Sequence, residues 1–242
     1  MKLFINRILI LVIFFQVAFN LVVLSQSMMD NDGNTINQVV ENKKIGKWIL
    51  YSEGDTQIPN GKRTLECIHS NDTLNGAIEI RENGKLILKI GKVDNNSKIE
   101  FTAFKGSKTI EGYFQKKGSK VKIFNLSGTE MTSKSRDWVA AKTEFIPLYY
   151  NGIEELHRDI KSLLSCDNVK GAKGTIYVGF TVDTNGYVKN PEVFKAINTT
   201  GESQYLLEKE ALRTVMLLPR FQPGFQSYRF VNTKFRIPIT FE

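Results

Sequence analysis

The sequence predicts an α+β protein in which a mainly antiparallel β domain precedes a smaller domain made of a β-hairpin, a helix and a long final strand. Three observations predict this class. In the first half, short apolar runs alternate with turn-forming pairs at intervals of roughly ten residues. In the second half, two segments carry apolar side chains at helical spacing, and two others alternate apolar and polar side chains as half-buried strands do.

The chain divides into five segments of different composition. Their predicted roles are a signal peptide or membrane anchor (1–27), a flexible lead-in (28–44), a β-rich domain of unknown role (45–126), a linker (127–150) and the domain with the hairpin, helix and final strand (151–242). The lead-in and the linker are assigned because they are polar and lack periodicity.

The first segment has the layout of an export signal. Lys2 and Arg7 precede an apolar run over residues 8–24, and Ser25 and Ser27 place small residues at the two positions that a signal peptidase reads. Two interpretations stay open. Either the chain is cleaved near Ser27, or residues 8–24 remain as a membrane anchor at the short limit of a span. Both predict that the rest of the chain is exported.

The β-rich domain is predicted from a series of strand-like runs. The clearest pair, 77–80 and 86–90, flanks Asn83 and Gly84, a dipeptide that favours a type I′ hairpin turn. Further runs lie at 48–51, 98–104, 109–114 and 120–124. Their even spacing predicts a small antiparallel meander.

The two cysteines, Cys67 and Cys166, fall in different predicted domains. An oxidising compartment permits a disulfide between them. Two separate buried thiols are the alternative. Neither cysteine has a CxxC partner or metal-ligand spacing, so the sequence predicts no metal site.

The second domain begins with a predicted helix. Its apolar residues form one stripe, made of Ile153, Leu156, Ile160, Leu163 and Leu164. A strand over 174–183 follows, then a return strand containing Pro191, which requires an edge position or a bulge. Residues 202–218 predict a second helix, which Pro219 ends. Residues 230–241 alternate as the final strand.

The sequence offers little support for catalysis. It contains no Gly-x-Ser-x-Gly, phosphate-binding loop, HExxH or paired Cys and His. His157 lies near neither an acid at ligand spacing nor a nucleophile, so a surface position is the simpler interpretation. We expect no enzyme, no catalytic residue and no cofactor. The net charge of +8 is thinly spread, which argues against nucleic-acid binding.

Three motifs in the last third of the chain resemble the C-terminal domain of TonB. The sequence at 174–186, Gly-Thr-Ile-Tyr-Val-Gly-Phe-Thr-Val-Asp-Thr-Asn-Gly, is similar to the family's opening strand and turn. Residues 210–212 with Leu-Pro-Arg-Phe-Gln-Pro-Gly at 218–224 resemble its helix end and aromatic-x-Pro-Gly turn. Phe-Arg-Ile-Pro-Ile-Thr-Phe at 235–241 resembles its closing strand. The helix that precedes these motifs fits the family as well.

The resemblance implies a periplasmic cell-envelope protein that docks onto an outer-membrane TonB-dependent receptor. An extended receptor peptide would add as a strand beside the last strand of the sheet, where backbone groups are unpaired. The predicted partner-binding residues on this edge are Tyr228, Phe230, Asn232, Lys234 and Arg236. The alternative is that the polar ones merely form a solvated face. An exposed edge also permits a homodimer.

Two functions follow from the resemblance. One is an energy transducer, anchored in the inner membrane by residues 8–24 and coupled to proton-driven motor proteins. The other is a secreted periplasmic interaction module that keeps the docking domain but has no motor coupling. The chain has six prolines in total and no Pro-rich rod of the kind that family transducers carry between anchor and docking domain.

Overall fold

The structure is a computed structural model that describes residues 28–29, 33–52, 63–91, 98–149, 152–169 and 171–242. The predicted signal peptide or anchor over 1–27 lies outside the described residues. Helices and mainly antiparallel strands are both present, which confirms the predicted α+β class. Among the residues that the structure describes, no helix is long and apolar enough to cross a membrane.

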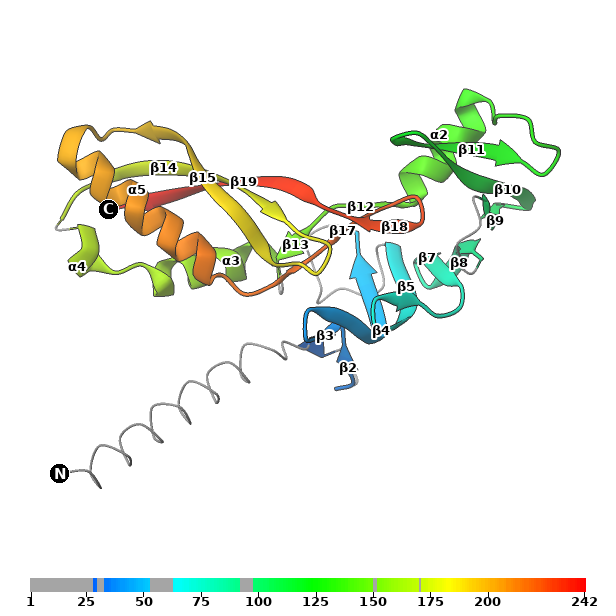
Figure 1. Cartoon of the computed structure of the whole chain (residues 1–242), viewed down its shortest axis with the longest axis horizontal. Coiled ribbons are helices and arrows are strands. Elements are labelled where there is room, and N and C mark those ends of the chain that lie inside the picture. Colours follow the sequence, from blue (N-terminus) through cyan, green and yellow to red (C-terminus); the bar gives the residue numbers. More distant parts are fainter. Residues whose placement is uncertain (1–27, 30–32, 53–62, 92–97, 150–151, 170) are drawn as a thin grey trace, which may run out of the picture.

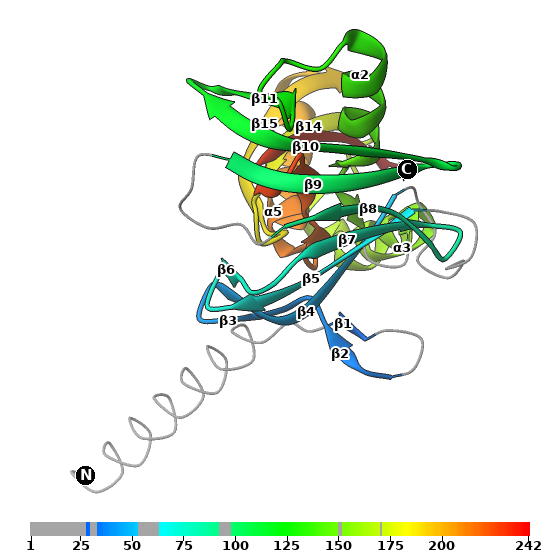
Figure 2. The ribbon, with the colours of Figure 1, turned by 90° about the vertical axis from the view of Figure 1, so that its right-hand side faces the viewer.

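The first half of the chain forms one large antiparallel sheet (Figures 1 and 2). Its strand order is β11-β10-β9-β8-β7-β5-β4-β3, so most neighbours in sequence are neighbours in space. The strands are β3 (Gln38–Val40), β4 (Lys43–Tyr51), β5 (Arg63–Ser70), β7 (Ile78–Glu82), β8 (Lys85–Ile90), β9 (Lys98–Lys105), β10 (Lys108–Lys117) and β11 (Lys120–Asn125), with β6 (Thr73–Leu74) paired to β5. Asn83 and Gly84 both have positive φ between β7 and β8, as a type I′ turn requires.

Strand β5 has no counterpart among the runs predicted from the sequence. Its inward-facing residues include Cys67 and His69, which are buried beside Leu65. A buried His and Cys weaken the alternation of apolar and polar residues. The sequence pattern therefore does not indicate a strand here, although β5 lies inside the sheet. Cys67 is a free thiol. The structure therefore contains no disulfide between Cys67 and Cys166, although the side chain of Cys166 itself lies outside what the structure describes.

Two segments that were predicted to be irregular are folded, and both predictions need correction. The lead-in contains β1 (Met28–Met29), β2 (Thr35–Ile36) and β3, with Val39 fully buried. The linker contains helix α2 (Ser133–Lys142) and strands β12 (Glu144–Phe145) and β13 (Leu148–Tyr149). Val139 and Phe145 pack into the core of the large sheet. Single apolar residues produce no periodic signal, yet each one finds a partner in the tertiary structure.

The C-terminal part contains a three-stranded antiparallel sheet of order β15-β14-β19. The strands are β14 (Gly174–Val182), β15 (Val188–Ile197) and β19 (Thr233–Phe241). Helix α5 (Gly201–Leu217) covers one face together with α3 (Gly152–Leu163) and the short α4 (Cys166–Val169). Alternate residues of β14, among them Ile176, Val178 and Phe180, form the core under these helices.

The two halves are interlocked and do not form separate modules. Strands β17 (Gly224–Gln226) and β18 (Arg229–Val231) form a hairpin that joins β12 in a small sheet, and β16 (Phe221–Gln222) pairs with β13. Phe225, Tyr228 and Phe230 of this hairpin pack into the core of the large sheet. Figure 1 shows the hairpin beside the strands of the β domain, at the end of β19. The last strand is therefore tied to the β domain at its N-terminal end.

Candidate functional site

Strand β19 is an outer strand of its sheet. Among the described residues it pairs with β14 alone, over the full register from Gly174 opposite Phe241 to Val182 opposite Thr233. Its other edge therefore carries backbone N–H and C=O groups that no described strand satisfies. Such an edge is a ready template for one more strand.

Pro238 determines which residues of β19 present their backbone to this free edge. It lies opposite Tyr177 and has no N–H to donate to β14. Pro238 therefore occupies a position whose backbone groups point away from β14. Because these positions alternate along an antiparallel pair, Lys234, Arg236 and Thr240 also direct their N–H and C=O groups to the free edge. The edge offers donors at these three positions and lacks one at Pro238.

The side chains of β19 separate into two faces. Ile237, Ile239 and Phe241 are buried on the face covered by the helices, whereas Lys234 and Arg236 are exposed on the opposite face. The side chain of Arg236 passes over Gly179 with its Cγ, and its guanidinium carbon lies 3.9 Å from the centre of the Phe194 ring on β15. Arg236 is therefore held over the sheet, and Lys234 stays free of ion pairs with any described residue.

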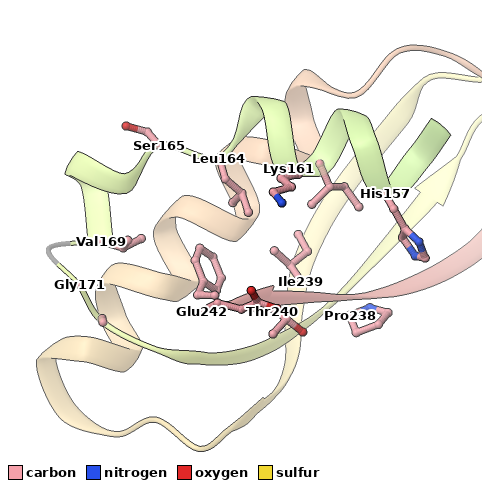
Figure 3. A pocket seen from close by; sticks show the side chains of 13 residues that line it. His157, Lys161, Leu164, Ser165, Val169, Gly171, Pro238, Ile239, Thr240 and Glu242 are labelled. Atoms are coloured by element: carbon pink, nitrogen blue, oxygen red, sulfur yellow. The ribbon is translucent and has the colours of Figure 1, made fainter. Parts of the chain in front are cut away.

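A groove of about 580 Å³ runs between β19 and helix α3. Figure 3 shows α3 on one side and β19 on the other, with Lys161 extending from the helix toward the strand and Ile239 directed at the helix. Leu164 and Val169 add apolar surface to the lining of the groove. The groove therefore lies directly beside the free backbone edge, on the buried face of the sheet.

Hydrogen bonds fix the position of α3 along its second half and beyond its C-terminal end. Within the helix, the carboxylate of Asp159 accepts a hydrogen bond from the phenol of Tyr149 on β13, and burial together with this acceptor raises the pKa of Tyr149. Beyond its end, Ser165 N donates to Glu210 Oε1 at 2.7 Å, and Asn168 Nδ2 donates to Glu210 Oε2 at 2.6 Å. The second half of α3 and the segment that follows it are thereby tied to the body of the domain.

Glu210 is a buried carboxylate with a full set of donors. It is 1% exposed, and Arg213 on the same helix completes its partners. Burial opposes its ionisation, but the hydrogen bonds from Arg213, Asn168 and Ser165 N prevail and lower its pKa to about 2. In the sequence Glu210 was only part of a motif. Its distant partners, Ser165 in the α3–α4 connection and Asn168 on α4, could not be identified from the sequence.

The five predicted partner-binding residues do not lie together. Lys234 and Arg236 are on β19 as expected. Asn232 precedes the strand, and its Oδ1 accepts a hydrogen bond from Thr184 N at 3.1 Å. Tyr228 and Phe230 belong to the β17–β18 hairpin and are half-buried against the β domain. The ring of Phe230 lies 5.5 Å from that of Trp48, and the ring of Tyr228 lies 5.9 Å from that of Phe114.

The residues of α3 that line the groove were missed as candidates, because their role depends on the position of α3 beside β19. His157, interpreted from the sequence as a surface residue, lies at the rim of the groove, and Lys161 reaches over it. In the sequence, the signal that could have pointed to these residues is the spacing of the polar positions on α3. Among the described residues, no group of three or more His, Cys, Asp or Glu is placed to hold a metal ion.

A free strand edge beside an apolar groove defines this part of the chain as an α+β domain suited to binding an extended partner. Residues 169–242 match the family model described as Gram-negative bacterial TonB protein C-terminal, which confirms the predicted resemblance. Domains of this family belong to envelope proteins that interact with outer-membrane receptors in general, and the family is not one of enzymes. The matched range begins after α3 and does not include the β domain. Neither a curated protein nor a solved structure matches the chain.

Proposed function

We propose that the chain is a TonB-like envelope protein that docks onto an outer-membrane receptor and supports energy-dependent transport. An extended receptor segment adds as a strand to the free edge of β19. The observation that carries the proposal is the unpaired edge itself, which runs beside a groove that takes side chains of the added strand. Backbone hydrogen bonds give affinity in this mode, and the groove gives selectivity.

In this proposal the two faces of the added strand have different surroundings. Partner residues opposite Ile237 and Ile239 project into the groove against α3, because directly opposed residues share one face of a sheet. Partner residues opposite Lys234 and Arg236 lie on the solvent face. We therefore keep these two residues as the partner-binding side chains of β19.

Tyr228 and Phe230 have a different role in this proposal. They hold the hairpin that precedes β19 in the β domain, and so fix the docking strand from its N-terminal side. Asn232 stabilises the junction of the hairpin with the β14–β15 turn. The β domain thus supports the docking strand. It occupies the position in the chain where family transducers carry a Pro-rich rod.

The alternative function is a secreted periplasmic module that has the same docking edge but no motor coupling. The two differ at the N-terminus. A transducer that works with inner-membrane, proton-driven motor proteins needs residues 8–24 as an uncleaved anchor, whereas a secreted module is cut near Ser27. N-terminal sequencing of the protein from separated membrane and soluble fractions of its native host distinguishes them: retention of Met1 in the membrane fraction supports the transducer and excludes the secreted module.

The docking mode is tested by removing one free-edge donor. Thr240→Pro deletes a backbone N–H that points away from β14, at a position equivalent to that of Pro238, where this N–H is already missing. Thr240→Ala is the matched control, because it loses the same hydroxyl but keeps the N–H. One hydrogen bond contributes about 0.5–1.5 kcal/mol, so we expect about two- to tenfold weaker binding for the proline variant alone. The assay is fluorescence anisotropy with peptides from the periplasmic N-terminal segments of the host's outer-membrane receptors.

A second measurement guards against a folding defect. Thermal unfolding of both variants shows whether the ladder to β14 is intact. If the proline variant folds normally and binds the peptides as tightly as the alanine variant, strand addition to β19 is refuted. Sedimentation of the free protein reports whether the same edge forms a homodimer, which would compete with the peptide.

A further inference from the structure

A second pocket, separate from the groove beside β19, lies where the β domain meets the turns of the C-terminal part. Its volume is about 530 Å³. The β domain contributes Lys44 of β4 and His69 of β5, and the C-terminal part contributes Asn185 of the β14–β15 turn and Arg229 of β18. Phe230 adds an apolar wall. Both halves of the chain are needed to build this pocket.

Lys44 places a buried ammonium group at the pocket. The residue is 5% exposed. Its Nζ donates to Asn185 Oδ1 at 2.6 Å, lies 3.6 Å from Asp72 Oδ1, and is 5.0 Å from the centre of the Phe230 ring. Burial lowers the pKa of Lys44, and the carboxylate of Asp72 opposes this effect. Asp72 is itself half exposed, so it compensates the buried charge only in part.

His69 supplies a neutral donor. It is 4% exposed, and burial together with the charge of Lys44 lowers its pKa to about 4. Burial raises the pKa of the Cys67 thiol to about 12, so the thiol keeps its proton. The Cys67 Sγ lies 3.8 Å from His69 Nδ1. A thiol that donates to Nδ1 leaves the ring proton on Nε2, for which the described part of the chain provides no acceptor.

The surroundings of the pocket carry an excess of positive charge. Arg220 is buried behind it, where the guanidinium donates to the carbonyl oxygens of Asn37 and Asn185 and lies over the ring of Trp48. Neither Arg220 nor Arg229 forms an ion pair with any residue that the structure describes. The pocket is therefore lined by the buried Lys44 and the half-buried Arg229, and Asp72 is the single acid in its lining. Arg220 lies outside the lining, and the carboxylate of Asp183 acts on both Lys44 and Arg220, so three cations face two acids in this region.

We propose that this pocket binds a ligand that carries an oxyanion, either a carboxylate or a phosphate group. Its oxygens accept hydrogen bonds from the Lys44 ammonium, the Arg229 guanidinium and His69 Nε2–H, and the remainder of the ligand rests against Phe230. An ionised carboxylate or phosphate only accepts hydrogen bonds, which matches three donors and an excess of positive charge. A sugar hydroxyl would leave that charge uncompensated.

Binding has a structural consequence because the donors come from both halves of the chain. A ligand held by Lys44 and Arg229 links strand β4 to the hairpin that precedes the docking strand. A ligand that binds the folded but not the unfolded chain raises the free energy of unfolding by RT ln(1 + [L]/Kd). The pocket would therefore strengthen the support of β19 without touching the docking edge, and its function does not depend on the receptor.

The test measures thermal unfolding of the full chain with phenyl phosphate, benzoate or inorganic phosphate, each against sodium chloride at equal ionic strength. We expect a saturable rise in Tm with at least one oxyanion. Arg229→Gln should weaken the fitted Kd at least tenfold. Lys43→Gln removes one charge from an exposed neighbour on β4 and should leave the Kd unchanged. No saturable rise beyond the chloride control, or equal weakening by both variants, would overturn the proposal.

A second arm identifies the source of the oxyanion. If the chain co-sediments with phosphatidylglycerol vesicles and phenyl phosphate releases it from them, the ligand of the site is a lipid headgroup. A rise in Tm with phenyl phosphate but no co-sedimentation assigns it to a soluble ligand. The site is contradicted if vesicle binding persists in phenyl phosphate and in Arg229→Gln while no oxyanion raises Tm. Such binding would come from the basic surface as a whole.

Discussion

Replacing Glu210 with Gln is the sharpest test of how the groove is held together. The substitution keeps the shape of the side chain but removes the charge that receives hydrogen bonds from Arg213, Asn168 and Ser165 N. The folded-state pKa of about 2 lies well below the ordinary value of 4.5. At about 1.4 kcal/mol per pKa unit, this difference corresponds to about 3 kcal/mol of stability at neutral pH.

The sign of the pH dependence follows from the lowered pKa. Above pH 4.5 the carboxylate is charged in both the folded and the unfolded chain, and the full stabilisation is present. As the pH falls from 4.5 toward 2, the unfolded chain takes up the proton first, and the stabilisation is lost. At pH 3 the contribution of Glu210 should be about 1.4 kcal/mol, and it should vanish below pH 2.

Urea unfolding of the native chain and Glu210→Gln at pH 7 and pH 3 measures both values. Glu208→Gln is the matched control, because it removes a carboxylate from the same helix at a half-buried position where Gln204 is the hydrogen-bond donor. We expect the control to change stability by less than about 0.5 kcal/mol. A loss for Glu210→Gln below about 1 kcal/mol at pH 7, or one that does not shrink at pH 3, would refute the assigned role of the charge.

Three further predictions concern tightly packed positions in the folded chain. Phe230→Ala should destabilise the whole chain by about 3 kcal/mol in one cooperative urea transition, because the ring packs against Trp48 of the β domain; two separate transitions would contradict the interlocked core. Gly186→Ala should lower Tm, since a Cβ there would lie 1.9 Å from the carbonyl oxygen of Phe221 at a φ of +92°, and an unchanged Tm would show that this approach is not required. In a Cys166→Ser background, Cys67 should react with a thiol reagent at pH 8 only after unfolding, and rapid labelling of the folded chain would contradict its burial.

The sequence was most informative where local periodicity and tertiary burial agree. Residues 202–218 predicted a helix, and α5 spans Gly201–Leu217. Asn83 and Gly84 predicted a hairpin turn because left-handed backbone is a local property of this dipeptide. The TonB-like motifs could be recognised for the same reason, since glycine, proline and aromatic residues at a turn leave a signature over a few positions.

Prediction failed where a residue depends on a partner that is distant in the chain. Tyr228 and Phe230 looked like the start of the final strand, but Trp48 and Phe114 lie far earlier in the sequence and bury them. Phe145 in the predicted linker meets Phe225 of the hairpin, with ring centres 6.4 Å apart. No window of neighbouring residues contains such pairs, so the sequence pattern together with the family resemblance placed Tyr228 and Phe230 on the edge strand.

The sequence by itself determined the α+β class, the main elements of the last domain and the resemblance of residues 169–242 to a family model, since each of these depends on short-range patterns of burial and turn geometry. The tertiary structure decided that β19 is an outer strand, that Pro238 sets the direction of its free donors, and that α3 forms a groove beside it. It also brought Lys44, His69 and Arg229 to one pocket. These features arise from the register and packing of distant segments, which only the folded chain brings into contact.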